Sequence, residues 1–304
     1  MQNQKSIDIK VIISLITLYL AWGATYLSIH YVVESCPPIL ASGARNLLAG
    51  LFIFIWVFFT QKSEKIAMNH FIKMIVAGFL MLSLGNGLLT IAGKWVPTGY
   101  MSLFPALVPA WIVIIQIFLG TKPNYITIAG LVLGFIGLLF LVNQEQLSIK
   151  GYEQYFTKGV ILLLLASIAW SAGVMYSVKN PLPYSTAKVS SIQMMAGGIT
   201  SLIASGFLGE YSLFEASKIG SNAIWGFTYL LFGGSILGFL VFTWVSKKAS
   251  PTLVSTYSYV NPLVAIFLGW LFLGEKLSTN MLISAVFIIA AVILITFGTS
   301  KKAE

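Results

Sequence analysis

The chain is 304 residues long, with 58% hydrophobic residues, only 9% charged residues and a formal net charge of +9. Soluble domains carry about 25% charged residues, so this composition excludes an ordinary soluble protein. The positive charge comes from the loops, as described below, and gives no reason to expect a nucleic-acid partner.

Ten stretches of the sequence are apolar over a length that can cross a bilayer, which takes roughly 17–25 residues. Backbone groups in lipid must pair within the segment, so runs of this length form helices rather than the shorter, alternating strands of barrels. The expected helices cover 11–33, 38–59, 71–92, 98–119, 125–143, 158–178, 184–208, 222–245, 251–273 and 279–298. The sequence therefore predicts an all-α polytopic membrane protein in a lipid bilayer.

If the ten helices cross the membrane in sequence, the lysines in the connecting loops are distributed unevenly between its two sides. If the N-terminus is cytoplasmic, the outer side carries five, namely Lys94, Lys150, Lys158, Lys218 and Lys276. The cytoplasmic side then carries twelve, namely Lys5, Lys10, Lys62, Lys65, Lys73, Lys122, Lys179, Lys188, Lys247, Lys248, Lys301 and Lys302. Basic residues accumulate in cytoplasmic loops. Both termini are therefore expected in the cytoplasm, with the 143–157 loop outside.

Two regions half a chain apart have the same plan. The segment 256–278 contains Pro262 and is followed by another apolar run. The segment 108–122 contains Pro109 at the matching place and is also followed by an apolar run. A pattern repeated half a chain apart indicates that the chain consists of two copies of one unit.

The repeat predicts how the chain is divided. The first copy would cover 1–142, an outer linker 143–157, and the second copy 158–304. Because five helices per copy is an odd number, the second copy would enter the membrane from the opposite side. Such inverted repeats recur in secondary transporters, with the substrate site near the middle of the membrane between the copies.

Several motifs appear together in the order of a known family. They are Trp22-Gly23, Arg45, Pro109, Asn261-Pro262 and Leu273-Gly274-Glu275. The chain thus resembles the EamA-type branch of the drug/metabolite transporter superfamily, and the resemblance covers all ten expected helices. The opening Trp-Gly-Ala-Thr-Tyr-Leu-Ser-Ile and the later Gly-Asn-Gly look closest to bacterial exporters of amino acids and related metabolites. One departure is Gly120-Thr121-Lys122, where the family often has Leu-Gly-Glu.

The resemblance implies a secondary transporter that exports a small organic solute across a bacterial-type cytoplasmic membrane, as a monomer or homodimer. Its expected cavity lies between the copies. The main alternative is a proton-coupled multidrug exporter, and a second is a membrane-embedded enzyme acting on a lipid-linked substrate. The sequence has no catalytic cluster, no P-loop and no metal motif. We therefore expect neither an enzyme nor a cofactor.

Aromatic side chains on the first and sixth expected helices are candidates for substrate contact. Tyr19, Trp22, Tyr26 and His30 share one helical face. Trp22 lies near mid-membrane, where an interfacial belt cannot explain it, whereas His30 is near the outer surface, where such belts are normal. By the repeat, Trp170 should oppose Trp22. Both rings could stack on a substrate.

Arg45 is the only charged residue well inside an expected helix. Such residues are energetically unfavourable in lipid and are usually functional. Two roles remain open at this point. Arg45 could bind a carboxylate or phosphate of the substrate, or it could pair with Glu34.

Other polar residues at membrane depth could line the cavity or bond a neighbouring helix. They are Asn86, Thr90, Gln193, Tyr259 and Asn261. Pro109 and Pro262 remove backbone hydrogen bonds, so they are candidates for bends that gate the cavity or for static kinks.

Acidic residues are missing from the middle of every expected helix. Proton-coupled transporters usually carry a buried carboxylate. The sequence therefore favours transport down the substrate gradient over proton coupling.

Overall fold

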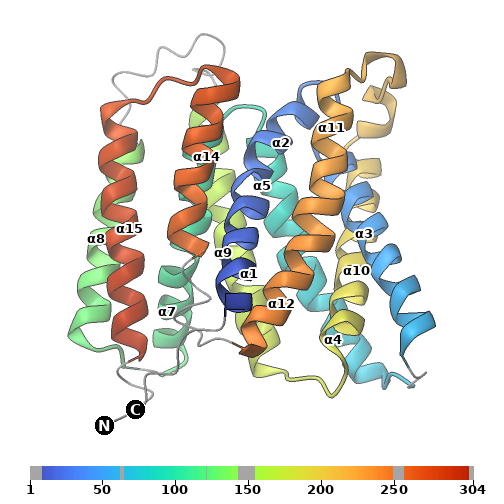
Figure 1. Cartoon of the computed structure of the whole chain (residues 1–304), viewed down its shortest axis with the longest axis horizontal. Coiled ribbons are helices and arrows are strands. Elements are labelled where there is room, and N and C mark those ends of the chain that lie inside the picture. The colour runs from blue at the N-terminus through green and yellow to red at the C-terminus, as the bar shows by residue number, and fades with distance from the viewer. Residues whose placement is uncertain (1–8, 62–64, 121, 143–154, 249–256, 301–304) are drawn as a thin grey trace.

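A computed structural model describes residues 9–61, 65–120, 122–142, 155–248 and 257–300. The described residues are helical and contain no strand. The long or regular helices are α1 (Ile9–Gly23), α2 (Thr25–Val33), α3 (Pro38–Thr60), α4 (Met68–Gly78), α5 (Asn86–Ala92), α6 (Thr98–Leu103), α7 (Val108–Phe118), α8 (Tyr125–Val142), α9 (Phe156–Lys179), α10 (Thr186–Phe207), α11 (Ser221–Tyr229), α12 (Gly238–Lys248), α14 (Tyr257–Leu273) and α15 (Thr279–Ser300). They stand side by side as an elongated bundle (Figure 1).

Five shorter segments have a different helical winding. Two are π-helices, η1 (Phe79–Gly85) between α4 and α5, and η5 (Leu230–Leu237) between α11 and α12. Three are 3₁₀-helices, η2 (Pro105–Leu107), η3 (Glu210–Leu213) and η4 (Ala216–Lys218). Several runs expected as single helices are therefore interrupted. The run 98–119 breaks at η2, and the runs 71–92 and 222–245 each contain a π-helix.

Six described helical runs are long and apolar enough to cross a membrane. They are Ile9–Val33, Pro38–Thr60, Met68–Ala92, Thr98–Phe118, Phe156–Lys179 and Ser221–Phe242. Shorter apolar helices cover Tyr125–Gly137, Val260–Leu273 and Thr279–Ile295. The helix α10 is long but carries many buried hydroxyl groups. The chain is therefore a multi-pass helical membrane protein, and the count of ten spans stays a prediction.

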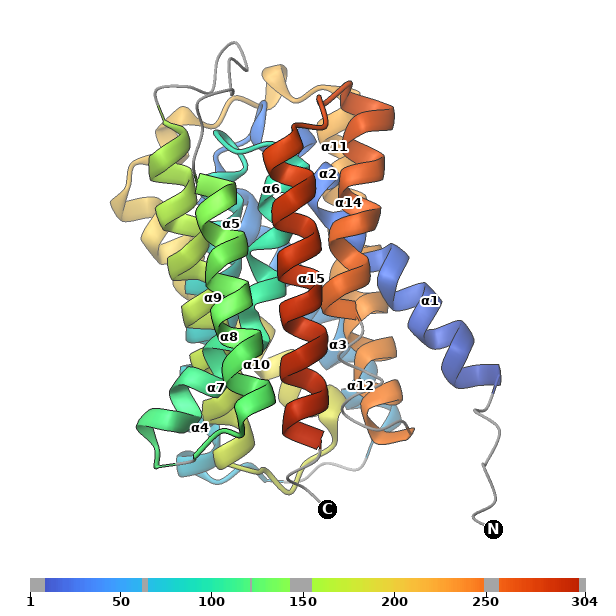
Figure 2. The ribbon, with the colours of Figure 1, turned by 90° about the vertical axis from the view of Figure 1, so that its left-hand side faces the viewer.

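Helices from the two halves of the chain pack against each other in matching pairs. The helix α3 packs along α10, and α8 packs along α15. The second pair is visible as neighbouring green and red helices in both ribbon views (Figures 1 and 2). In addition, α1 contacts α12, while α9 contacts η1 and α5. The core therefore forms mainly between the halves rather than within each half.

Small residues permit this close packing. In α8, a side chain at Gly130 would lie 2.8 Å from Ile295, and one at Gly137 would lie 2.9 Å from Ile288, both on α15. Close backbone approach through glycine is the usual means of helix association in lipid, where burial from water gives no driving force between helices.

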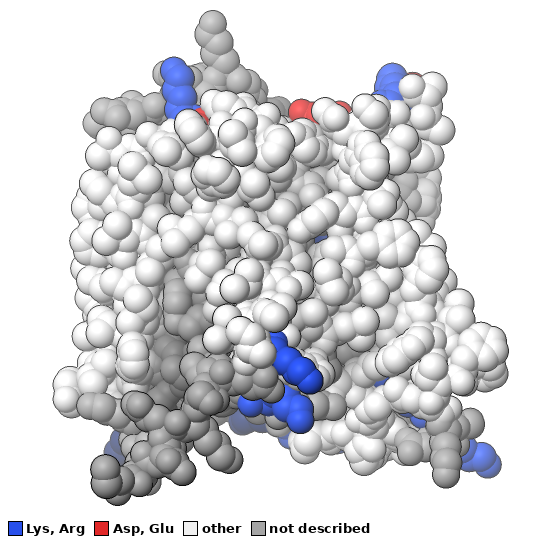
Figure 3. Space-filling view, viewed as in Figure 1, with Lys and Arg blue, Asp and Glu red and all other residues white. Residues whose placement is uncertain are grey.

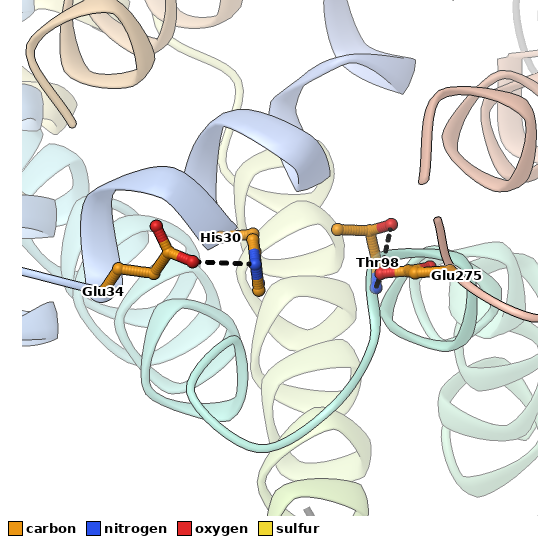
Figure 4. Close-up of polar contacts among 4 residues, drawn as sticks. All are labelled: His30, Glu34, Thr98 and Glu275. Atoms are coloured by element: carbon orange, nitrogen blue, oxygen red, sulfur yellow. Dashed lines mark hydrogen bonds and ion pairs between the residues drawn. The ribbon is translucent and has the colours of Figure 1, made fainter. Parts of the chain in front are cut away.

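Charged side chains gather near the two ends of the bundle on the face drawn in Figure 3, and the acidic ones visible there lie at the upper end. Two of the acids cap helices of the other half. Glu210 accepts hydrogen bonds from the backbone N–H groups of Ile39 (3.3 Å) and Leu40 (2.7 Å) at the start of α3. Glu275 accepts bonds from the N–H groups of Thr98 (2.7 Å) and Gly99 (3.2 Å) at the start of α6 (Figure 4). These carboxylates satisfy donors that a helix cannot pair internally.

Replacing Glu275 by alanine should lower the stability of the protein by about 1–2 kcal/mol, because two backbone donors at the start of α6 lose their acceptor. The measurement is the thermal unfolding midpoint in detergent. Glu215 provides a matched control, since its carboxylate forms only an exposed ion pair with Lys218 at 2.7 Å. Glu215→Ala should change stability by less than about 0.5 kcal/mol. Equal midpoints for the two variants would show that the Glu275 cap contributes nothing.

Candidate functional site

A cavity of about 120 Å³ lies within the bundle, between helices of both halves. The segments that contribute are α1, α2, α3, α5, α6, α7, α9, α12 and α14, together with η1, η2 and η5. Its lining residues are Trp22, Thr25, Tyr26, Ile29, Arg45, Gly85, Asn86, Leu89, Ser102, Pro105, Ala106, Val108, Leu163, Ala166, Ser167, Trp170, Gly234, Ser235, Phe239, Tyr257 and Asn261.

The size and lining of the cavity limit what it can hold. An apolar cavity of about 150 Å³ is known to hold a benzene-sized molecule. A cavity of about 120 Å³ therefore suits a small organic solute. The walls are mostly apolar and aromatic, with a few polar groups, as in typical small-molecule sites.

Trp22 forms one wall and is held firmly by its neighbours. Its indole nitrogen donates to the carbonyl oxygen of Gly234 in η5 at 3.0 Å. Its ring centroid lies 5.0 Å from that of Tyr257 and 5.2 Å from that of Phe242, which are typical distances for aromatic pairs. A side chain at Gly238 would overlap the indole, so this glycine makes room for the ring.

Trp170, from α9, borders the same cavity but is held less completely. A side chain on Gly85, the last residue of η1, would lie 3.3 Å from its ring. No described residue accepts a hydrogen bond from its indole nitrogen or forms an aromatic pair with it. The ring is partly buried. Beside the cavity, Trp170 therefore has neither a hydrogen-bond acceptor nor an aromatic partner among the described residues, although it packs against apolar side chains.

The two tryptophans occupy corresponding places in the two halves. Trp22, in the first half, packs on the π-helix of the second half, while Trp170, in the second half, packs on the π-helix of the first. Inserted π-turns widen a helix locally and are frequent at functional sites. Both wide turns reach the cavity, through Gly85 and Gly234.

Arg45 lines the cavity from α3 and is only 7% exposed. Its neighbour Asn46 is fully buried and donates instead to the carbonyl oxygen of Leu82 at 3.4 Å. Pairing between Arg45 and Glu34 is not found. The Glu34 carboxylate instead lies 3.3 Å from Nε2 of His30 at the C-terminal end of α2 (Figure 4), and His30 does not line the cavity.

Asn86 and Asn261 both border the cavity, but their side-chain amides differ in hydrogen bonding. The amide of Asn86, at the start of α5, has no partner among the described residues. The amide nitrogen of Asn261, once oriented to satisfy its surroundings, donates to the carbonyl oxygens of Tyr257 (3.2 Å) and Tyr19 (3.3 Å). Asn261 therefore joins α14 to α1, whereas Asn86 is available to a ligand.

Three other polar candidates do not line the cavity or cannot be placed there. Thr90 is buried, and its hydroxyl donates to the carbonyl oxygen of Asn86 at 2.7 Å within α5. Gln193 is buried in α10, with its backbone against Gly78 of α4. The side chain of Tyr259 lies outside the described part of the chain. Tyr257, two residues earlier, borders the cavity.

The two prolines expected to bend helices occupy different positions. Pro262 lies inside α14. Pro109 is at the start of α7, where the missing N–H group has no effect because the first turn has no internal acceptor. The interruption in this region is at η2, which begins at Pro105, and Pro105 lines the cavity. The gating role of both prolines stays a prediction.

Several lining residues carry no signal in the sequence that would single them out. Ser235 and Phe239 belong to η5 and α12, where Gly234 and Gly238 are spaced as a helix-packing motif. The two glycines do pack against Trp22 and Thr25. The residues that follow them, Ser235 and Phe239, line the cavity. Ser102 could be identified from the sequence, because its spacing places it on the same helical face as Pro105 and Pro109.

The fold is that of a multi-pass membrane protein with a cavity between its two halves. The EamA-like transporter family model matches residues 9–143 and again 157–297. The chain therefore belongs to the EamA-like transporter family, with two copies of its repeat.

Similar proteins are named as transporters. The chain is 32% identical over 287 residues to "Uncharacterized inner membrane transporter YedA" of Escherichia coli K12, covering 94% of this chain and 90% of YedA. It is 27% identical to "Uncharacterized transporter YoaV" of Bacillus subtilis, covering 97% and 99%. A solved crystal structure with 19% sequence identity matches 98% of this chain and 100% of its own, with a TM-score of 0.62. That structure supports the fold alone.

Proposed function

We propose that the protein is a secondary transporter that moves a small organic solute, an amino acid or a related metabolite, across the cytoplasmic membrane. The observation that carries this proposal is the cavity between the two halves, where Arg45, Asn86 and Trp170 each have polar atoms without a partner among the described residues. Its volume of about 120 Å³ supports a small solute over a bulky drug.

The proposed mechanism is alternating access, in which the two halves move relative to each other around the cavity. The interrupted helices support it, since η1, η2 and η5 all border the cavity and each is a weak point in a helix. The proposed direction is export, with both termini cytoplasmic. Because α1 begins and α15 ends at the same end of the bundle (Figure 1), the fold supports both termini lying on one side of the membrane, and the distribution of lysines supports the cytoplasm as that side.

The proposed cycle has no embedded carboxylate that takes up and releases a proton. All described acids, Glu34, Glu210, Glu215 and Glu275, lie outside the cavity lining. Proton-coupled transporters usually carry a buried carboxylate at such a site. The described lining residues also include no pair of nucleophile and base of the kind that an enzyme acting on lipid-linked substrates would use.

Exchange in proteoliposomes tests the function. Vesicles loaded with unlabelled amino acids and related metabolites should take up the matching labelled solute, at a rate that an imposed pH gradient does not change. Empty vesicles and vesicles containing heat-denatured protein are the controls. Uphill accumulation that depends on the pH gradient would contradict the uncoupled mechanism and favour the proton-coupled exporter. Absence of exchange for every solute would contradict the transport function.

A further inference from the structure

The Arg45 guanidinium has more hydrogen-bond donors than partners. A guanidinium has five N–H donors. Among the described residues the guanidinium forms one hydrogen bond, from Nη2 to the side-chain oxygen of Asn46, and at 3.5 Å it is at the limit of a real bond. The Nε atom is buried and has no partner in the described part of the chain.

A buried cation in this state is energetically unfavourable without an anion. Leaving buried charged donors unpaired costs more than leaving neutral ones unpaired. No acid among the described residues lies within ion-pair distance of Arg45. Because the residue borders the cavity, an anionic group of a bound solute could reach the unused donors.

We propose that Arg45 binds the carboxylate of the transported solute, so that the cavity selects solutes that carry a single carboxylate. This inference rests on the proposed transport function. A planar guanidinium can hold a carboxylate through two parallel hydrogen bonds, which fixes its orientation as well as its charge.

The charge of the cavity favours a carboxylate over a phosphate. Arg45 is the only charged residue among the described residues that line the cavity. One carboxylate balances one guanidinium. A phosphate monoester carries about −1.5 to −2 charges at neutral pH, which would leave buried negative charge without a partner.

The other walls fit the rest of such a solute. Leu89, Leu163 and Phe239 supply apolar surface, and Trp170, which also lines the cavity and has no aromatic partner among the described residues, adds a ring on which a solute could stack. The amide of Asn86 can bond one further polar group, such as the amino group of an amino acid. No acid lines the described cavity, so the carboxylate rather than an ammonium group is the charge that the site recognises.

Binding to the purified full-length protein tests the inference, with matched acids and amides as probes. The pairs are 4-methylpentanoate with 4-methylpentanamide, and leucine with leucinamide. The acid of at least one pair should bind about tenfold or more tightly than its amide, because only the acid can pair with the guanidinium. In Arg45→Gln, the acid and the amide should bind within about twofold of each other, and Arg45→Lys should retain part of the preference.

Lys218→Gln is the control for loss of one positive charge, because Lys218 is exposed and pairs with Glu215 away from the cavity. It should keep the full preference. Equal binding of acid and amide by the wild type would overturn the inference, as would failure of all four probes to bind. If Arg45→Gln does not fold, the wild-type comparison and Arg45→Lys still decide.

Transport of the same probes separates this inference from the proposed function. Wild-type protein that exchanges amides as fast as acids would be a transporter without carboxylate selection, which overturns the inference alone. Wild-type protein that binds the acids selectively but exchanges none of them would support the Arg45 site and overturn the transport function.

Discussion

Trp170→Ala should reduce solute exchange by about tenfold or more while leaving the thermal unfolding midpoint close to that of the wild type. The ring borders the cavity, but no described residue pairs with its indole nitrogen or stacks on it, so its removal affects the bound solute more than the protein. A stacked ring that covers about 60 Å² of apolar solute surface contributes about 1.5 kcal/mol, which corresponds to roughly tenfold. Trp170→Phe should recover part of the activity, since it restores a stacking surface.

Trp22 provides the matched control, because it lies at the corresponding place in the other half. Its indole bonds Gly234 at 3.0 Å and its ring packs against Phe239, Phe242 and Tyr257. Trp22→Ala should therefore reduce transport and also lower the free energy of unfolding by about 3 kcal/mol or more, which lowers the unfolding midpoint. If Trp170→Ala unfolds as readily as Trp22→Ala, the side chain of Trp170 has a packing role instead.

The helices and the general location of the site could be predicted from the sequence for a simple physical reason. Long apolar runs in lipid must be helical, and a polar side chain in such a run needs a partner or a cavity. Trp22, Arg45, Asn86 and Trp170 are such residues, and the structure places all four at the cavity. The same argument cannot distinguish a cavity from a packed interface, which is why it also selected Gln193.

The details of the site depend on contacts between distant parts of the chain. The π-helices η1 and η5 have ordinary apolar sequences, and nothing local distinguishes them from α-helix. The carboxylate of Glu275 caps a helix that lies 177 residues earlier, so no spacing pattern reveals it. That Tyr257 borders the cavity likewise depends on how α14 is rotated against α1, which a count along the helix leaves undetermined.

Gly78→Ala should destabilise the protein by about 1–3 kcal/mol, although the same substitution in a helix usually stabilises. Gly78 is the last residue of α4, and a side chain there would overlap the backbone carbonyl of Gln193 in α10. Gly197 of α10 lies at the same contact between α4 and α10, because a side-chain carbon added to it would be 2.8 Å from the carbonyl oxygen of Gly78. The atoms that an alanine side chain would meet belong to the backbone, which cannot move aside as a flexible side chain can. The substitution therefore forces α4 and α10 apart.

Gly87→Ala is the matched control for Gly78→Ala, since Gly87 is in the same helical run and has no neighbouring atom within 4 Å of an added side-chain carbon. It should leave the unfolding midpoint unchanged or raise it slightly, by the propensity gain of up to about 1 kcal/mol. The crossing at Gly78 also sets the position of η1, which begins one residue later and ends at Gly85 beside Trp170. Gly78→Ala should therefore reduce exchange by more than its loss of folded protein explains, as measured by transport per folded molecule. An unfolding midpoint for Gly78→Ala at or above that of Gly87→Ala would show that α4 and α10 can move apart freely, and that η1 is not positioned by this contact.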